Sequence, residues 1–360
     1  MVGRAGRGGV RTARDPGRAG TVRRGQARST ALPLMGWTLA FAVVAVLFVL
    51  ISGANDGATL IGLGLRFPHT PGWVAVALLV AVLFAGPYVL GVTVARTFTE
   101  GLAGLGTSVG AAVFLAGVVI AIVVVAALTG KGLPTSLTLA VIGGISGAGL
   151  GAGVPVSWGS LARVLAIGLC APAVGLVLGY LLGTASRQVP SYRRMPKLVL
   201  AAHLVAYTAQ CTAYAVNDGQ KMIAVVSVAL DVGRNGLGRV GPVAVSPAWM
   251  AVLAALFLAG SLTSLNRVGE RIGRGLVIAR PLHVLSAETA ATGAVLGSSA
   301  LGSPVSMTQS VTAGVVGVVA SEGSRRVRWQ GVLNMGTAWL VTLPSSLLLG
   351  ALAGLGLRLL

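Results

Sequence analysis

The strongest constraint on this chain is a series of long apolar stretches that recur along its 360 residues. They cover residues 37–51, 73–95, 107–128, 161–182 and 248–265. Several of them approach the ~20 residues that a membrane-spanning helix needs. Only 10% of the residues are charged, whereas a soluble protein carries roughly a quarter. The sequence therefore predicts an all-α polytopic protein of the cell membrane, with about ten spans counted by length and loop charge.

Basic residues outnumber acidic ones, giving a net charge of +19, but their distribution argues against nucleic-acid binding. Eight arginines lie in residues 1–28, and others cluster at residues 187–197, 267–280 and 325–328. Basic segments beside membrane spans orient the protein and contact anionic headgroups. We therefore expect membrane lipids rather than nucleic acid as partners, and we place the 187–197 loop in the cytoplasm.

The amino-terminal segment differs from the rest of the chain. Residues 1–34 are rich in Arg, Gly and Ala and lack apolar periodicity, so we expect a disordered tail. Translation from Met35 would remove it. The two cysteines and three histidines are scattered through the chain, and we therefore expect neither a disulfide nor a metal site of nitrogen and sulfur ligands.

An internal repeat divides the remaining sequence. The pairs Asn55-Asp56 and Asn217-Asp218 lie 162 positions apart, and a Pro-x-Ser-x-Thr segment recurs at Pro134 and Pro304, 170 positions apart. A tryptophan follows each segment, at 158 and 329. The common order and the nearly constant spacing predict two transmembrane repeats, residues 35–185 and 198–360, joined by the basic loop 186–197. The residues alone do not decide whether the repeats run parallel or inverted.

Each Asn-Asp pair lies inside an apolar stretch, where an ionisable side chain is costly and usually functional. Asn-Asp-Gly is a poor helix former, so we expect a helix interruption that exposes backbone groups. Asp56 and Asp218 would then supply negative charge for Na⁺ or a proton; the alternative is a helix cap at the membrane surface. Lys221 follows Asp218 at helical spacing and can pair with it, or its side chain can extend to the interface.

The two Pro-x-Ser-x-Thr segments predict re-entrant turns that present neutral hydroxyl groups. The hydroxyls are those of Ser136, Thr138, Ser306 and Thr308. They suit a tetrahedral oxyanion because they donate hydrogen bonds without adding fixed charge, although Ser and Thr also bond to the backbone of ordinary helices. Glu288 is the third acidic residue in an apolar region. Two roles are open for it: a further site residue, or the cap of the next helix.

Together these motifs resemble the inorganic phosphate transporter (PiT) family, over roughly residues 36–358. That family repeats a Gly-x-Asn-Asp signature, matched by residues 53–56, and its second copy continues with Gln-Lys, matched by Gln220 and Lys221. The resemblance implies a symporter that moves phosphate with Na⁺ or H⁺ through two inverted repeats with broken helices and re-entrant hairpins. Asp56 and Asp218 would bind the cation, and Asn55, Asn217 and the hairpin hydroxyls would line the substrate and ion sites. No tightly bound cofactor is expected, and a homodimer is a further expectation.

Both hairpins depart from the family signature Pro-Val-Ser-Thr-Thr-His. They read Pro-Thr-Ser-Leu-Thr-Leu at 134–139 and Pro-Val-Ser-Met-Thr-Gln at 304–309, so one Thr and the His are replaced in each. Three alternatives therefore remain: a sulfate or other oxyanion permease of the same fold, a sensor or scaffold that does not transport, and an intramembrane enzyme that uses Asp56 and Asp218 as a carboxylate pair.

Overall fold

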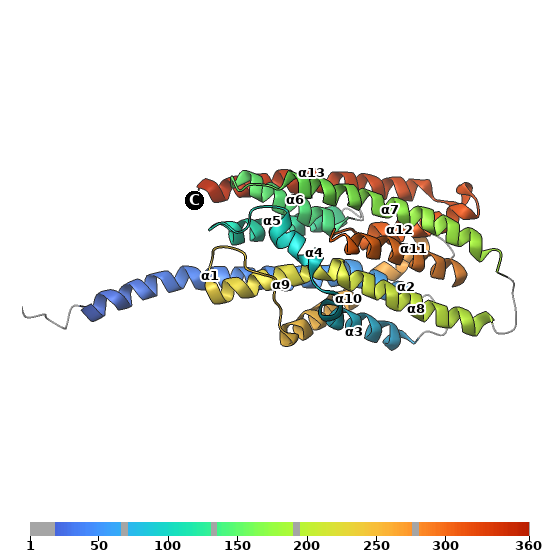
Figure 1. Ribbon diagram of the computed structural model, residues 1–360, viewed down its shortest axis with the longest axis horizontal. Coiled ribbons are helices and arrows are strands. Elements are labelled where there is room, and N and C mark those ends of the chain that lie inside the picture. Colours follow the sequence, from blue (N-terminus) through green and yellow to red (C-terminus); the bar gives the residue numbers. More distant parts are fainter. Residues whose placement is uncertain (1–18, 66–70, 131–134, 190–194, 276–280, 360) are drawn as a thin grey trace, which may run out of the picture.

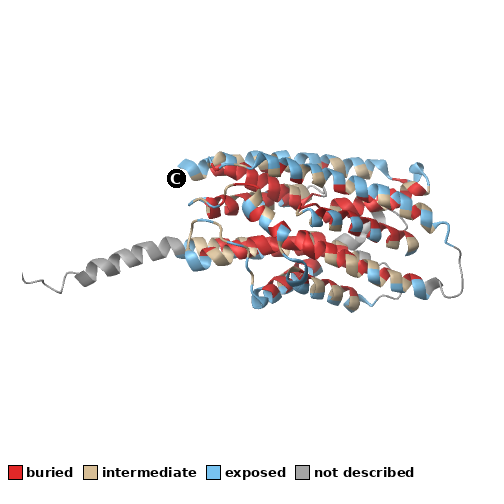
Figure 2. Cartoon of the chain, in the orientation of Figure 1, coloured by how far each residue is buried: buried red, intermediate tan, exposed pale blue. Residues whose placement is uncertain are grey.

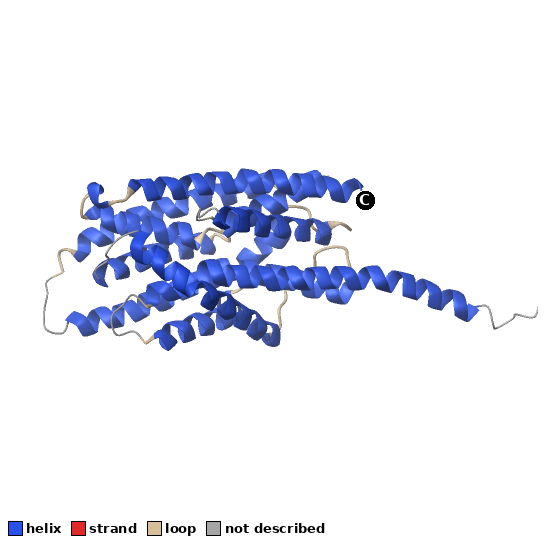
Figure 3. Ribbon diagram, turned by 180° about the vertical axis from the view of Figure 1, so that it is seen from behind, coloured by secondary structure: helices blue, strands red, loops and turns tan. Residues whose placement is uncertain are grey.

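The computed structural model describes residues 19–65, 71–130, 135–189, 195–275 and 281–359. Over these residues the chain is built from helices and connecting loops (Figures 1 and 3). The elements, in chain order, are α1 (Ala19–Ser52), η1 (Gly53–Gly57), α2 (Ala58–Gly64), α3 (Gly72–Leu90), α4 (Thr93–Arg96), η2 (Thr97–Gly101), α5 (Gly110–Gly130), α6 (Leu137–Gly151), α7 (Trp158–Ser186), α8 (Met195–Val216), α9 (Asp218–Asn235), α10 (Pro247–Gly275), α11 (Pro281–Ala300), α12 (Met307–Ser321), η3 (Ser324–Arg326) and α13 (Trp329–Leu359).

Seven helical stretches among the described residues are long and apolar enough to cross a membrane. They are Met35–Gly62, Gly72–Leu90, Gly110–Thr129, Trp158–Ser186, Lys197–Asn235, Pro247–Leu265 and Trp329–Leu359. Two shorter apolar helices, Leu137–Ala152 and Met307–Ser321, lie among them. The predicted all-α polytopic architecture is confirmed, while the count of about ten spans stays a prediction.

The outward faces of the bundle carry large apolar side chains. Leu169, Leu340 and Leu352 are all exposed, and Figure 2 shows exposed residues along the outer helices with buried residues between them. Such a continuous apolar exterior is unusual for a soluble protein and suits contact with lipid.

Helices from the two halves of the chain are exchanged in the bundle. α6 from the first half packs against α13 at the carboxyl end, and α12 from the second half packs against α7 (Figure 1). Small residues make both contacts close: a Cβ on Gly147 would overlap the Leu347 carbonyl, and one on Gly179 would overlap the Gly314 carbonyl. Close backbone approach through small residues is typical of membrane helix packing.

Each Asn-Asp pair lies at an irregularity, but the two irregularities differ. Asn217 has φ −115° and ψ −81° and separates α8 from α9, near the middle of the 39-residue candidate span Lys197–Asn235. The first pair lies in the π-helical turn η1, which continues directly from α1 into α2. The predicted interruption is therefore a break at Asn217 but a widened turn at Asn55-Asp56. In this turn the backbone hydrogen bonds join residues five positions apart instead of four, and the helix continues.

Several boundaries depart from the sequence-based expectation. α10 continues to Gly275, so much of the basic 267–280 segment extends a helix beyond its apolar part. α11 begins at Pro281, which places Glu288 two turns inside the helix and rules out its role as a cap. α1 begins at Ala19, so residues 19–34 of the expected disordered tail are helical. Residues 1–18, residues 131–134 with Pro134, and residues 190–194 of the basic loop lie outside the described residues, and the repeat boundaries stay predictions.

Candidate functional site

Asp56 occupies the π-helical turn η1 and is 4% exposed. Its Oδ1 accepts hydrogen bonds from the Asn55 amide at 2.9 Å and from the Thr308 hydroxyl at 3.1 Å. Its Oδ2 is buried and accepts no hydrogen bond from the described residues. Glycines let the turn lie against α10, because a Cβ on Gly53 would overlap the Phe257 carbonyl. Asp56 Oδ2 is thereby held inside the protein without a hydrogen-bond partner among the described residues.

Asp218 is the first residue of α9 and is 2% exposed. Its Oδ1 forms an ion pair with Lys221, which is equally buried. Lys221 also donates to the Thr138 hydroxyl at 2.7 Å, and that hydroxyl lies 3.2 Å from the Val305 carbonyl and 3.4 Å from Asp218 Oδ1. Lys221 therefore points into the protein rather than to the membrane interface, and Asp218 Oδ2, like its counterpart in Asp56, has no partner among the described residues.

The two aspartate clusters form one electrostatic centre. Asp56 interacts with the charges of both Lys221 and Asp218, and both aspartates act on the buried hydroxyl of Tyr214. The contacts also cross between the halves of the chain: Thr138 from the first half lies against Asp218, and Thr308 from the second half bonds to Asp56. Each hairpin threonine thus reaches the aspartate of the other half.

Asn217 holds the segment between α11 and α12 against this centre. Its amide nitrogen donates to the Ser299 hydroxyl at 2.8 Å and to the Ser303 carbonyl at 3.2 Å, and its amide oxygen accepts from the Val305 backbone N–H at 3.0 Å. Sequence reasoning missed Ser299 and Ser303, because they lie before the Pro-x-Ser-x-Thr segment. The break at Asn217 therefore frees an amide side chain to hold the segment between α11 and α12 of its own half.

Three helix N-termini converge here. Asp218 begins α9, and Thr138 and Thr308 are the second residues of α6 and α12. Helix N-termini carry partial positive charge and unpaired N–H groups that favour anions. The free carboxylate oxygens, with nearby hydroxyl and amide oxygens, match the oxygen donors that hard cations prefer. The centre can therefore hold an anion and a cation side by side.

Other residues expected at the site have different roles. The Ser136 hydroxyl caps α6 by accepting from the Leu139 N–H at 3.3 Å, and Ser306 precedes α12. The Gln220 amide accepts from Ala95 N–H and donates to Gly91 carbonyl, each at 2.9 Å, and so braces α9 against the α3–α4 connection. Glu288 pairs with His203 rather than with either aspartate.

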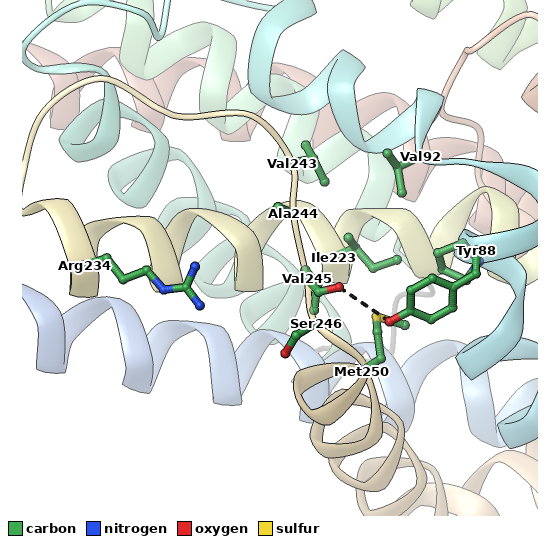
Figure 4. A pocket seen from close by; sticks show the side chains of 10 residues that line it. Tyr88, Val92, Ile223, Arg234, Val243, Ala244, Val245, Ser246 and Met250 are labelled. Carbon is green, nitrogen blue, oxygen red and sulfur yellow. Dashed lines mark hydrogen bonds between the residues drawn. The ribbon is translucent and has the colours of Figure 1, made fainter.

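A cavity of about 450 Å³ lies along α9 beyond Gln220 (Figure 4). Its lining joins the end of α3, the middle and end of α9, and the loop before α10, and it includes Ile223 and Ser246. The Tyr88 hydroxyl, which lies across this space, donates to the Val245 carbonyl at 3.5 Å. Arg234 is the charged residue of the lining and lies at the end of the cavity toward the end of α9 (Figure 4). The cavity therefore has one cationic end, and its lining includes none of the residues that form the aspartate centre.

Among the described residues, no three His, Cys, Asp or Glu side chains gather as potential ligands of one metal ion. The oxygen donors of the centre come from two carboxylates with amide and hydroxyl groups.

Comparison with known proteins identifies relatives along most of the chain. The family model of the phosphate transporter family matches residues 52–198 and 184–350. A Mycobacterium tuberculosis (strain CDC 1551 / Oshkosh) protein described as a probable low-affinity inorganic phosphate transporter is 32% identical over 86% of this chain and 75% of its own length. A Rhizobium meliloti protein with the same description is 27% identical over 89% of this chain and 96% of its own length.

A similarly described Mycobacterium leprae protein is 31% identical, and that match covers 61% of this chain and 54% of the relative. A solved structure titled "The sodium-dependent phosphate transporter" superposes with a TM-score of 0.75, at 15% identity, over 90% of this chain and 100% of the other. The structural match shows a shared fold. The family model covers well over half of the chain and a relative above 30% identity spans most of it, so this multi-pass membrane protein belongs to the phosphate transporter family, whose members are transporters rather than enzymes.

Proposed function

We propose that this protein is a symporter that moves inorganic phosphate across the cell membrane together with Na⁺ or H⁺. The observation that carries the proposal is the crossed contact of each hairpin threonine with the aspartate of the other half, at two helix irregularities. The relatives named as inorganic phosphate transporters support phosphate as the substrate.

Phosphate would bind where the N-termini of α6 and α12 meet Lys221. Hydroxyl and backbone N–H donors suit its oxygens, and the lysine adds a positive charge. The coupling cation would bind at the free Oδ2 atoms of Asp56 and Asp218. Occupation of the two subsites together is favourable, because each ion offsets the charge that the other brings into a low-dielectric interior.

The finer architecture that we propose is a pair of inverted repeats, with α5–α6 and α11–α12 as re-entrant hairpins. The exchanged pairs α6–α13 and α12–α7 support this arrangement, since each hairpin packs on a long helix of the other half. Because each threonine–aspartate contact also crosses between the halves, ion binding at either aspartate would act on the hairpin of the other repeat. Secondary transporters of this design bind substrate near the membrane midplane, at discontinuous helices. A homodimer and direct contacts with lipid headgroups stay predictions.

The test is uptake of radiolabelled phosphate into proteoliposomes under a Na⁺ gradient, a pH gradient, or neither. We expect accumulation with at least one gradient and its loss in the Asp56→Asn and Asp218→Asn variants. The matched control is Glu100→Gln, which removes an exposed carboxylate that belongs to neither Asn-Asp pair. Absence of uptake under every gradient, or equal uptake by the two aspartate variants, would refute the proposal.

Unlabelled sulfate, added in excess, distinguishes the substrate. The phosphate proposal expects little competition, whereas strong inhibition together with uptake of labelled sulfate would support the alternative of a general oxyanion permease. Binding of phosphate without uptake would support a non-transporting sensor.

A further inference from the structure

A stripe of buried polar side chains runs along one face of α8. Its members follow at alternating intervals of four and three positions, the spacing of one helix face, and each is 0% exposed. They are His203, Tyr207, Gln210, Tyr214 and Asn217. At 1.5 Å per residue the stripe spans about 21 Å. It leads from the aspartate centre to the end of α8 that follows the basic 186–197 loop.

α11 faces this stripe and is fastened to it at two points. His203 Nδ1 lies 2.8 Å from Glu288 Oε2, and the Asn217 amide donates to the Ser299 hydroxyl at 2.8 Å. The first contact lies toward the beginning of both helices and the second toward their ends, so the helices run in the same direction. The two ends of the stripe therefore contact α11, whereas the Tyr207 hydroxyl donates to the Ala75 carbonyl of α3 at 3.2 Å and the Tyr214 ring packs against Phe257 of α10.

Along α8 and α11, between the two contacts, several polar atoms have no hydrogen-bond partner among the described residues. They are both amide atoms of Gln210, the Thr292 hydroxyl, the Tyr214 hydroxyl and Glu288 Oε1, and all are buried. Buried polar groups are costly unless bonded, and ordered water commonly supplies the missing bonds. The unpartnered atoms extend along the two helices from Glu288 to Tyr214, whose hydroxyl interacts with Asp56 and Asp218. We infer that water molecules bonded to these atoms form a track.

The pair at the far end of the stripe is suited to a proton rather than to a metal cation. One carboxylate and one imidazole offer too few oxygen ligands for Na⁺, whereas His is the side chain whose charge changes near neutral pH. Glu288 is 1% exposed, and its carboxylate lies 2.8 Å from His203 Nδ1. With a neutral imidazole and a carboxylate the pair carries one negative charge; one bound proton, on either group, makes it neutral.

Other ionisable groups of the described helices lie on α3, α7, α8, α9 and α11. Tyr207 and Cys211 on α8 interact with Glu288, and groups of their type are neutral near pH 7. His283 on α11 pairs with Glu322 at 3.2 Å. Tyr88 on α3 is exposed. The ionisable residues of α7, which are also exposed, are Arg163, Cys170 and Tyr180, and α12 carries no ionisable side chain. The ionisable residues of α9 are Asp218 and Lys221 of the centre, with Asp231 and Arg234 near its far end.

We propose that the His203–Glu288 pair is a proton-binding site, joined to the Asp56–Asp218 centre by a hydrated track along α8, and that the proton that drives symport reaches the two aspartates through this pair. The proposal rests on the proposed function, since it assigns the coupling ion. The proton comes from the aqueous phase on one side and returns to the aqueous phase on the other. The bonds made and broken are an N–H or O–H bond of the pair and one of water.

Two measurements on the full-length protein test the site. The first is proton uptake by purified protein between pH 5 and 8, the range over which His charge changes, measured potentiometrically. We expect the double variant His203→Gln, Glu288→Gln to bind about one proton fewer than wild type. The comparison variant is His283→Gln with Glu322→Gln, which removes the other His–carboxylate pair, between His283 on α11 and Glu322 at the end of α12. An equal proton count for wild type and the His203/Glu288 double variant would overturn the proposal.

The second measurement is phosphate uptake into proteoliposomes. We expect Glu288→Gln and His203→Gln each to lower accumulation driven by a pH gradient at least tenfold, while phosphate–phosphate exchange without a gradient continues. Gradient-driven accumulation at the wild-type level in both variants would refute the site. Wild-type accumulation under a Na⁺ gradient alone would overturn this inference and leave the proposed function standing, whereas no uptake under any condition would overturn the proposed function. If a variant also loses phosphate–phosphate exchange, the number of protons that the purified double variant binds decides whether the proposal stands.

Discussion

The buried ion pair between Lys221 and Asp218 makes a sharp prediction about stability. Both side chains are 2% exposed, and Asp56 adds a second carboxylate that interacts with the same lysine. Replacing Lys221 by Met removes the positive charge and leaves two buried carboxylates that interact with each other without it. Breaking one partner of a buried pair costs about 3–5 kcal/mol. We therefore expect Lys221→Met to lower the melting temperature in detergent by several degrees.

Na⁺ provides the decisive second arm of this experiment. If the aspartates bind a cation, Na⁺ replaces part of the missing charge and stabilises the variant in proportion to the logarithm of its concentration. Melting curves followed by tryptophan fluorescence in Na⁺ or choline should show a larger Na⁺ effect in Lys221→Met than in wild type. Adding Asp218→Asn should restore most of the lost stability, because it removes the uncompensated charge.

The matched control is Lys197→Met, which removes an exposed lysine at the beginning of the same candidate span. It should melt like wild type and show no added response to Na⁺. The reasoning is refuted if Lys221→Met also melts like wild type, or if Asp218→Asn makes it still less stable.

Three further predictions follow from individual contacts. Thr308→Val removes a hydroxyl donor to Asp56, a bond to a charged group worth about 1.5–3 kcal/mol, so the cation concentration for half-maximal uptake should rise roughly tenfold or more; an unchanged value would contradict the contact's role. Arg234→Ala should raise the phosphate concentration for half-maximal uptake, most strongly at low ionic strength, because the positive charge at one end of the cavity attracts anions; an effect independent of salt would argue against attraction. Gly147→Leu should lower the yield of folded protein, since its side chain would overlap the α13 backbone; normal folding would show that α6 and α13 are not this close.

The chemistry of the site could be predicted from the sequence more readily than its geometry. Asp56 and Asp218 are identifiable because a carboxylate within an apolar stretch is costly. The i,i+3 spacing allows either a Lys221–Asp218 pair or a lysine that extends to the interface, and the structure contains the pair. The crossed contacts of Thr138 and Thr308 could not be predicted, because they depend on how segments far apart in the sequence pack.

Other details depended on local geometry that residue types leave open. The same Asn-Asp pair forms a widened turn at Asp56 and a break at Asn217, and the sequence pattern is alike in both. Gln220 was expected at the site but braces the α3–α4 connection. The regular spacing of polar residues from His203 to Asn217 is a signal present in the sequence. It is hard to recognise there, because a search for metal ligands considers the three scattered histidines alone and not their polar neighbours on one helix face.

The central claim is that two crossed Asn-Asp and hairpin units bind a cation and phosphate together. The most direct measurement is the binding of labelled phosphate to purified protein, with and without Na⁺ and at acidic and alkaline pH. The account predicts that one of these cations increases phosphate affinity, and that the Asp56→Asn, Asp218→Asn double variant loses the increase. Phosphate affinity that is independent of both cations, or an increase that survives in the double variant, would contradict it.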